Sequence, residues 1–311
     1  MSEKYSLRKV YGKTLSELGD KYKNIVVLDG DLSKSTKTEI FQKKFPDRFF
    51  DIGIAEADLI GTAAGLASCD KIPFVSSFAI FATGKCWEQI RNTIAYSKFN
   101  VKIVATHACL SVGEDGASHQ NCEDIAIMNV IPNMQIIVPS DDVSTRFFTE
   151  KIANIDGPVY MRLPRNETER IYCEDKEFKF GKAEILRDDG DITIFSIGLM
   201  TNIALKAAYI LRQEGIKVNI VDIITVKPID KETILNFLKK TNKAVVCEEH
   251  EINGGLTSII SQLSAQYLPS HIESVSIEDK FGESGKWNEL FNEYGLTEEN
   301  IIKKVKVLQN D

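Results

Sequence analysis

The chain has 311 residues, of which 43% are hydrophobic and 27% are charged, with a formal net charge of -7 and a pI near 5.4. This length and composition allow a large core divided over about two domains, and they exclude a disordered or fibrous protein. The acidic balance argues against nucleic-acid binding, because phosphate neutralisation needs a basic face. The start M-S-E-K-Y-S-L-R-K-V lacks the apolar core of a signal peptide, and no apolar run reaches the roughly 18 residues of a membrane span. We therefore expect a cytoplasmic protein without membrane contact.

Apolar runs alternate with amphipathic stretches through the first half of the chain. These runs predict strands at 25–29, 49–52, 73–77, 101–106, 135–138 and 158–162. Helices are predicted at 6–21, 56–68, 83–96 and 141–152, the last with acidic residues in its first turn. Such repetition of strand and helix predicts an α/β fold, in which a mostly parallel sheet is covered by helices on both faces.

The alternation lapses into polar and charged sequence from about Leu163 to Lys182. We therefore predict a first domain at residues 1–165, a linker at 166–182 and a second domain at 183–311. Beyond the linker, strands are predicted at 191–198, 217–222, 243–248 and 274–277, with helices at 200–214 and after Gly254-Gly255. The second domain is thus expected to be a smaller α/β unit, also with a mostly parallel sheet covered by helices.

The six cysteines stand at positions 69, 86, 109, 122, 173 and 247, never with C-x-x-C spacing. Most lie in apolar or helical stretches, which favours reduced, small core residues over a disulfide framework or a metal site. Cys109 and Cys122 differ from the others because they flank the polar block described next.

A polar block at 105–120 reads A-T-H-A-C-L-S-V-G-E-D-G-A-S-H-Q and holds two of the four histidines of the chain. It follows directly on a predicted strand. In open parallel sheets, ligands bind beyond the carboxyl ends of the strands, where the loops converge. Other polar or aromatic positions also follow or end predicted strands, and we expect them to share one edge with this block: Asp29-Gly30-Asp31, Glu56, Phe78 and Arg162.

Four motifs of the first domain are G-I-A-E-A-D at 53–58, S-S-F-A-I-F at 76–81, A-T-H at 105–107 and G-E-D-G-A-S-H-Q at 113–120. In letters, order and spacing they resemble the pyrimidine-binding domain of transketolases. The second domain has F-S-I-G at 195–198, V-K-P-I-D at 226–230 and E-E-H at 248–250. These resemble the C-terminal domain of the same family. The G-D-G and downstream asparagines with which full-length transketolases bind the cofactor's diphosphate and metal have no counterpart in this sequence.

The resemblance implies the C-terminal subunit of a split transketolase, which would be inactive alone. A separate N-terminal subunit would hold the diphosphate of thiamine diphosphate together with Mg²⁺ or Ca²⁺, so no metal site is expected in this chain. The family also implies an α2β2 assembly. The implied reaction transfers a two-carbon ketol unit from a ketose phosphate to an aldose phosphate through a carbanion of the cofactor.

Four residues are implied to bind or activate the cofactor. Glu56 would share a proton with the pyrimidine ring nitrogen, because small apolar neighbours desolvate its carboxyl. The alternative for Glu56 is an acid that complements a helix dipole. Phe81 would stack on the pyrimidine and Phe78 would line its pocket, although core packing also explains two such phenylalanines. Asp31 matches a family aspartate near the thiazolium part of the cofactor.

The remaining candidates are implied to bind the substrate. His119 would approach the reacting carbon, where the developing oxyanion needs a donor, and Asp115 would receive a substrate hydroxyl. Arg162 is the expected phosphate ligand, because a guanidinium binds phosphate in bidentate fashion. His107, Ser35 and Arg8 resemble the other residues with which the family binds the substrate phosphate.

Two departures from the family pattern and two rival functions remain open. Many transketolases have a tyrosine at the position of Gly84, and aspartate and serine in place of Ala108-Cys109. The rival functions are a related thiamine-dependent subunit, such as a 2-oxoacid dehydrogenase β chain or a deoxyxylulose-phosphate synthase, and a non-catalytic partner subunit. His107 favours transketolase, since the synthase pattern has an aspartate there. His250 and His271 are expected to be structural.

Overall fold

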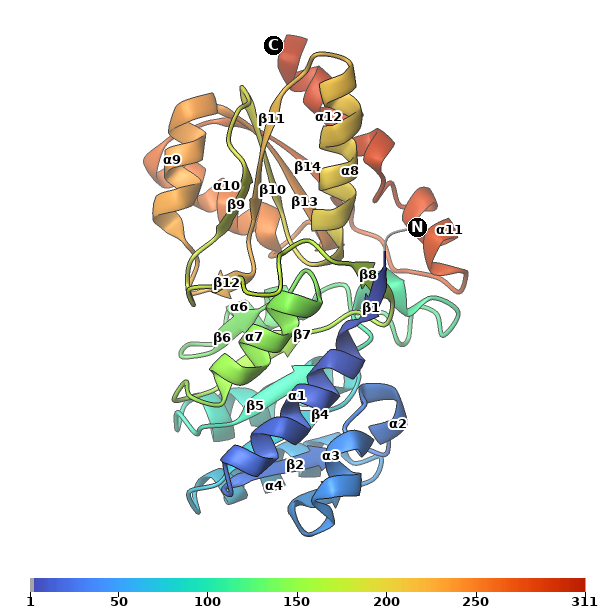
Figure 1. Ribbon diagram of the computed structural model, residues 1–311, viewed down its shortest axis with the longest axis vertical. Helices are drawn as coiled ribbons and strands as arrows, with labels where there is room; N and C mark the ends of the chain where they lie inside the picture. Colours follow the sequence, from blue (N-terminus) through green and yellow to red (C-terminus); the bar gives the residue numbers. More distant parts are fainter. Residues whose placement is uncertain (1–2, 311) are drawn as a thin grey trace.

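The structure is a computed structural model that describes residues 3–310 as two α/β units stacked along the long axis (Figure 1). The first unit contains β2 (Ile25–Asp29), β3 (Phe49–Asp51), β4 (Ile72–Ser76), β5 (Lys102–Ala105), β6 (Gln135–Ile137) and β7 (Val159–Arg162). These strands are mutually parallel, in the order β6-β7-β5-β4-β2-β3. Each strand overlaps a predicted one, and the predicted fold class is confirmed.

The strands of the first sheet are buried on both faces, because helices cover each side. Every residue of β2, β5 and β7 is buried, so successive side chains enter two different cores. Leu28 packs in the core under α4 (Glu56–Ala67) and α6 (Asp124–Asn129). Val27 packs in the opposite core, under α1 (Leu7–Lys21), α3 (Glu39–Lys44) and α7 (Asp142–Ile152).

The helix predicted at 83–96 is irregular in the structure. A short α5 (Trp87–Gln89) lies between two π-helical segments, η2 (Ile80–Gly84) and η3 (Ile90–Ala95). The Thr83 hydroxyl donates to the Ala79 carbonyl at 2.7 Å inside this stretch. π-Helical turns often occur at functional sites, and η2 carries Phe81 and Gly84 to the ligand edge of the sheet.

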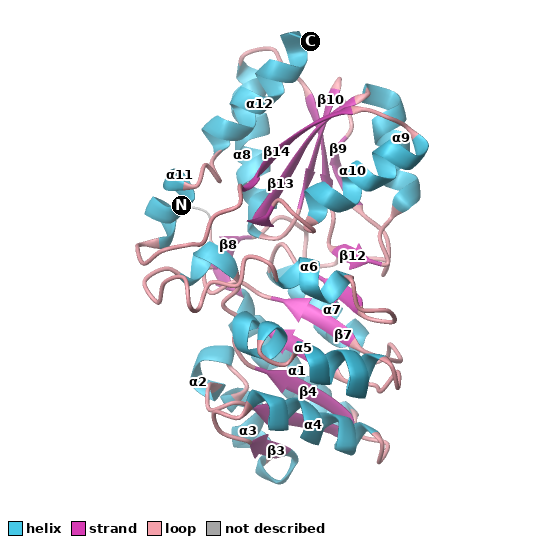
Figure 2. Cartoon of the chain, turned by 180° about the vertical axis from the view of Figure 1, so that it is seen from behind, coloured by secondary structure: helices cyan, strands magenta, loops and turns pink. Residues whose placement is uncertain are grey.

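The second unit has four parallel strands, β10 (Ile192–Ser196), β11 (Val218–Asp222), β13 (Lys243–Glu251) and β14 (His271–Ile277). The edge strand β9 (Glu184–Arg187) is antiparallel to β11. One face is covered by α8 (Leu199–Gln213) and α12 (Glu298–Asn310), and the other by α9 (Lys231–Thr241) and α10 (Leu256–Tyr267) (Figure 2). The second predicted α/β unit is therefore present.

The two units are joined by more than the chain connection, because one strand from the second half of the sequence pairs with the sheet of the first unit. β12 (Thr225–Lys227) belongs by sequence to the second unit, yet it pairs antiparallel with β6 at the edge of the first sheet. The segment predicted as a linker contains β8 (Glu167–Glu169), which pairs antiparallel with β1 (Lys4–Ser6). One apolar core runs across the junction and includes both Val138 and Ile223.

The carboxyl ends of β2, β4, β5 and β7 open on the same edge, because these strands are parallel. A backbone bridge between Phe78 and Thr106 extends the pairing of β4 and β5 to this edge. No helix within residues 3–310 has the length and apolar character needed to cross a membrane.

Candidate active site

Two histidines and two phenylalanines contact one another at the ligand edge. The His107 ring stacks on Phe78 with 3.8 Å between ring centroids, and Phe78 lies 6.0 Å from Phe81 at an interplanar angle of 17°. His119 approaches Phe81 edge-on, with 5.3 Å between centroids. The structure therefore brings together residues from two segments, those that follow β4 and β5, and Phe81 is the more exposed of the two phenylalanines.

The G-E-D-G turn between these histidines requires its glycines. Gly113 and Gly116 have φ of 82° and 78°, a region that side chains with a Cβ rarely adopt. A Cβ at Gly116 would also collide with Ser284 of the second unit. The turn leaves Asp115 exposed at the rim of the site, and the His119 amide donates to the Gly116 carbonyl at 2.9 Å.

Two arginines lie beside His107. Arg8 Nη1 donates to the Ser35 carbonyl at 2.6 Å and lies 3.5 Å from His107 Nε2, and its Nη2 donates to the Arg165 carbonyl at 2.8 Å. Burial and the nearby Arg165 guanidinium lower the pKa of Arg8. Within residues 3–310, Arg8 Nε is buried without a hydrogen-bond partner. Adjacent cations with an unused donor favour an anionic ligand.

Arg162, the phosphate ligand expected from the sequence, is buried in the structure and already paired with protein groups. The side chain is 6% exposed, and Nε donates to Asp124 Oδ2 at 2.8 Å. Nη2 donates to the carbonyl of Glu249 in the second unit at 2.8 Å. Arg162 is the last residue of β7, so its side chain still belongs to the buried interior and not to the loop that follows.

Arg165, which the sequence reasoning missed, occupies the place expected of Arg162. It lies three residues beyond the end of β7, its side chain is 36% exposed, and Nη1 is 3.6 Å from Glu114 and 3.9 Å from Asp115. Nη1 also donates to the Val112 carbonyl. The predicted end of the strand could have identified Arg165, because an arginine just beyond a buried strand reaches solvent, whereas an arginine within the strand does not.

Glu56 is the first residue of α4, and its side chain is 3% exposed. Lys85, another residue that the sequence reasoning missed, donates to Glu56 Oε2 at 2.5 Å. This ion pair raises the pKa of Lys85. If a ring nitrogen of a ligand bound Glu56, it would meet a carboxylate that already forms an ion pair with Lys85, the residue directly after η2.

Asp31 and Ser35 lie on the loop and helix after β2. Asp31 is exposed with φ of 61°, and its amide donates to Asp51 Oδ1 at 3.0 Å. Ser35, in α2 (Ser33–Thr36), meets the cluster through its carbonyl, which accepts from Arg8. The buried acid here is Asp29, whose pKa is raised to about 6 by burial.

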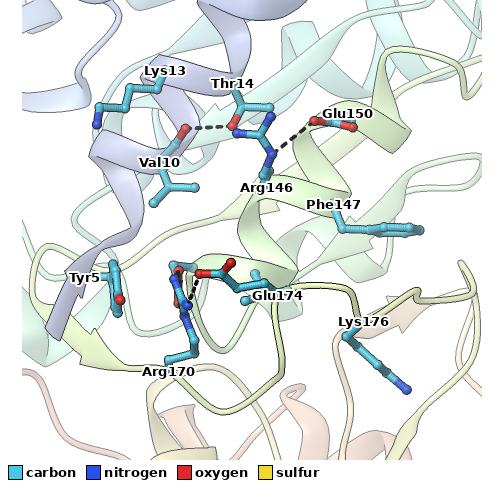
Figure 3. Close-up of a pocket in the computed structure, with 12 residues that line it drawn as sticks. Tyr5, Val10, Lys13, Thr14, Arg146, Phe147, Glu150, Arg170, Glu174 and Lys176 are labelled. Carbon is cyan, nitrogen blue, oxygen red and sulfur yellow. Dashed lines mark hydrogen bonds and ion pairs between the residues drawn. The ribbon is translucent and has the colours of Figure 1, made fainter. Parts of the chain in front are cut away.

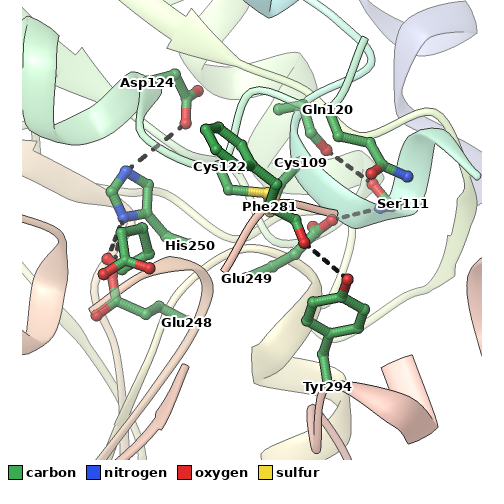
Figure 4. The surroundings of a disulfide bond; sticks show 12 residues. Cys109, Ser111, Gln120, Cys122, Asp124, Glu248, Glu249, His250, Phe281 and Tyr294 are labelled. Atoms are coloured by element: carbon green, nitrogen blue, oxygen red, sulfur yellow. Dashed lines mark hydrogen bonds and ion pairs between the residues drawn. A yellow bond between two sulfur atoms is a disulfide. The ribbon is translucent and has the colours of Figure 1, made fainter. Parts of the chain in front are cut away.

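The expectation of reduced cysteines is wrong for Cys109 and Cys122, which form a disulfide (Figure 4). Cys109 begins the turn η4 (Cys109–Val112) and Cys122 follows Asn121 near α6, so the loop folds back and brings the two sulfurs together. Sequence spacing could not reveal this, because their approach depends on the return of the whole loop. The disulfide closes the segment that carries Asp115 and His119.

A separate cavity of about 540 Å³ lies between α1 and α7 (Figure 3). Its charged side chains largely bind each other, as Arg170 does with Asp142 and Arg146 with Glu150. None of the predicted site residues lines it. Within residues 3–310, no cluster of three or more histidine, cysteine or acidic side chains has the geometry to hold a metal ion.

Neutral His107 should make stability depend on pH. Burial, together with Arg8 and Arg165, lowers the pKa of His107 from 6.5 to about 2. The unfolded chain binds the proton more readily, so this contribution is complete above pH 6.5 and is lost as the pH falls toward 2. We expect the stability advantage of the natural chain over His107→Asn to shrink by about 1.4 kcal/mol for each pH unit below 6.5. Urea unfolding across this range tests it, and parallel pH profiles for the two chains would refute it.

Two family models match the chain. Residues 3–170 match the transketolase pyrimidine-binding domain, and residues 181–301 match the transketolase C-terminal domain. The chain therefore belongs to the transketolase family, whose function is ketol transfer, and it corresponds to the C-terminal section of those enzymes.

Individual relatives agree with this family. The chain is 51% identical to a "Putative transketolase C-terminal section" from Methanocaldococcus jannaschii, covering 96% of this chain and 95% of that protein. It is 38% identical to a 6-deoxy-6-sulfo-D-fructose transketolase subunit from Clostridium sp., covering 97% and 94%. A solved structure titled as a split gene transketolase, inactive beta4 tetramer, superposes with a TM-score of 0.91 at 46% identity, covering 97% of this chain and 98% of that one.

Proposed function

We propose that this chain is the C-terminal subunit of a two-polypeptide transketolase that acts on ketose and aldose phosphates. The observation that supports it best is the cluster of Arg8, His107 and Arg165 beside the aromatic pair at the ligand edge. An anion such as a sugar phosphate would meet two guanidinium groups and one neutral imidazole there.

The residues at the sheet edge fit the pyrimidine half of thiamine diphosphate. The bound cofactor supplies a carbanion that accepts and releases the ketol unit. Glu56 would hold a proton at the pyrimidine ring nitrogen, and its near-complete burial leaves little water to compete for that hydrogen bond. Phe81 would stack on the ring and Phe78 would close the pocket from the His107 side. Asp31, on the loop after β2, would face the thiazolium side.

The loop between the two cysteines would present the substrate-facing groups. His119 would donate a hydrogen bond at the reacting carbon, and Asp115 would accept one from a sugar hydroxyl. Arg8, Arg165 and His107 would bind the phosphate, with Ser35 orienting Arg8 through its carbonyl. Arg162 is replaced by Arg165 in this assignment.

A second polypeptide would complete the enzyme. The names of the relatives, a C-terminal section and a subunit, together with the split-gene title of the structural neighbour, support a partner N-terminal subunit. That partner would hold the diphosphate and Mg²⁺ or Ca²⁺, and two copies of each subunit would form an α2β2 assembly. A cytoplasmic enzyme of sugar phosphate metabolism, such as the pentose phosphate pathway, fits this substrate class.

The experiment mixes the chain with its N-terminal partner, thiamine diphosphate and Mg²⁺, and follows ketol transfer between ketose and aldose phosphates. Product formation that needs both polypeptides is the expected result. Turnover of a 2-oxoacid, or condensation of pyruvate with an aldehyde, would instead support one of the related thiamine-dependent enzymes. No turnover with any of these substrates would favour a non-catalytic subunit.

A further inference from the structure

The loop with Asp115 and His119 is held at its base by the second unit. Glu249, near the end of β13, is 2% exposed, and its Oε1 accepts a hydrogen bond from the Ser111 amide at 2.7 Å (Figure 4). Ser111 lies in η4, between His107 and the G-E-D-G turn, and it is fully buried. A carboxylate of the C-terminal domain therefore reaches directly into the segment that joins the two substrate-facing parts of the site.

The far end of the same loop is also tied to the second unit. Gln120 Nε2 donates to the Glu283 carbonyl at 2.9 Å and to the Gly113 carbonyl at 3.2 Å. Ser284 packs so closely on Gly116 that a Cβ there would not fit. The loop is thus enclosed between the two units, and Glu249 is its buried anchor.

The carboxyl of Glu249 lies among charged neighbours, and within residues 3–310 its Oε2 is buried without a hydrogen-bond partner. Arg162 donates to the Glu249 carbonyl at 2.8 Å and supplies the nearby positive charge, while Asp124 on α6 supplies a second negative one. The neighbouring His250 accepts from the Ala126 amide through Nε2 at 3.3 Å, and its Nδ1 lies 2.6 Å from the Glu251 carbonyl.

We propose that Glu249 is a positioning residue, which sets the placement of the 109–119 segment and through it the binding of the sugar substrate. The expected effect on substrate binding rests on the proposed function. The expected effect on the placement of the segment does not depend on it. It gives the C-terminal domain a part in the active site through a direct contact with this segment. Burial raises the pKa of Glu249 to about 7, which agrees with a carboxyl retained for geometry at a cost in desolvation.

Glu248 offers a matched control. It is equally buried, it is the adjacent residue on β13, and its carboxylate accepts backbone hydrogen bonds from Leu256 at 2.6 Å and Thr257 at 2.8 Å. Those bonds cap α10 inside the second unit and do not reach the loop. Glu248→Ala should therefore destabilise the fold without moving the 109–119 segment.

The first measurement is hydrogen exchange of the full chain, read over peptides that contain residues 109–119. Glu249→Ala should speed exchange there by about tenfold or more, since a buried hydrogen bond is lost. Glu249→Gln keeps an acceptor at Oε1 and should retain protection. Glu248→Ala should leave these peptides unchanged. Unchanged exchange in Glu249→Ala, or equal exchange in the Glu248 variant, would overturn the proposal.

The second measurement uses the assembled enzyme. Glu249→Ala should raise the KM for the sugar phosphates by about tenfold, because small displacements of binding groups are costly. Its half-saturating thiamine diphosphate concentration should change less than about twofold, since Glu56 and Phe81, which would hold the pyrimidine ring, lie outside this segment in α4 and η2. Glu249→Gln should restore KM. A KM change in Glu248→Ala as large as in Glu249→Ala would overturn the substrate part. If the natural assembly showed no activity, only the proposed function would be refuted, because the hydrogen-exchange result does not depend on that function.

Discussion

Glu56→Gln should lower the kcat of the assembled enzyme by about 10³-fold. The glutamine amide nearly matches the shape of the buried side chain but cannot share a proton with the pyrimidine ring nitrogen. Because the side chain is 3% exposed, water has little room to replace the carboxyl. Steady-state ketol transfer with saturating cofactor measures the loss.

Asp58→Asn is the control for the rival explanation of Glu56. Both acids lie in the first turn of α4, where a negative charge complements the helix dipole, and Asp58 is exposed. If the dipole were the role of Glu56, both substitutions would lower stability by about 0.3–1 kcal/mol and leave kcat alone. We expect kcat to fall in Glu56→Gln only. Near-normal turnover in that variant would remove Glu56 from the mechanism.

Arg165→Ala should raise the KM for phosphorylated aldoses by about 10- to 100-fold, the loss expected for one or two hydrogen bonds to a charged group. An unphosphorylated aldose should be used as well as by the natural enzyme, because it makes no contact with the guanidinium. The ratio of kcat/KM for the two acceptors is the measurement. The KM of Arg165→Lys for phosphorylated aldoses should lie between those of the natural enzyme and Arg165→Ala, since lysine keeps the charge without the bidentate geometry.

Arg162→Met distinguishes the two arginines. Its loss leaves Asp124 buried without its cation, which should lower the free energy of unfolding by about 3–5 kcal/mol. Denaturant unfolding of the full chain measures this. If Arg162→Met kept its stability and lost selectivity for phosphorylated substrates, Arg162 would be the phosphate ligand after all.

Periodicity predicted the parallel strands of both units and the helices α1, α4, α7, α8 and α10, because their burial follows from local alternation, but it did not predict α9, α12 or β9. β2 is fully buried and bounded by polar residues, so its limits at 25–29 were predictable. β12 and β8 were not predicted, since each is short and pairs with a strand distant in sequence. The π-helical turns around α5 were also missed, because hydrophobic period alone does not distinguish them from an α-helix.

Within the site, loop positions were easier to predict than side-chain directions. His107, His119, Phe78 and Phe81 came together because parallel strands deliver their loops to one edge. The burial of Arg162 was not predicted, because the sequence did not show that this residue at the end of a strand has an inward-facing side chain. Lys85 and Glu249 depend on tertiary contacts across 29 and 138 residues, which no local pattern reports.

The central claim is that this chain supplies the pyrimidine half of a cofactor site and a second polypeptide supplies the rest. The most direct test is a titration of thiamine diphosphate, with Mg²⁺ present, into the isolated chain and into an equimolar mixture with the N-terminal subunit. The account predicts saturable binding in the mixture and negligible binding by the isolated chain, because the diphosphate and its metal ion lie on the partner. Tight binding by the isolated chain would contradict it.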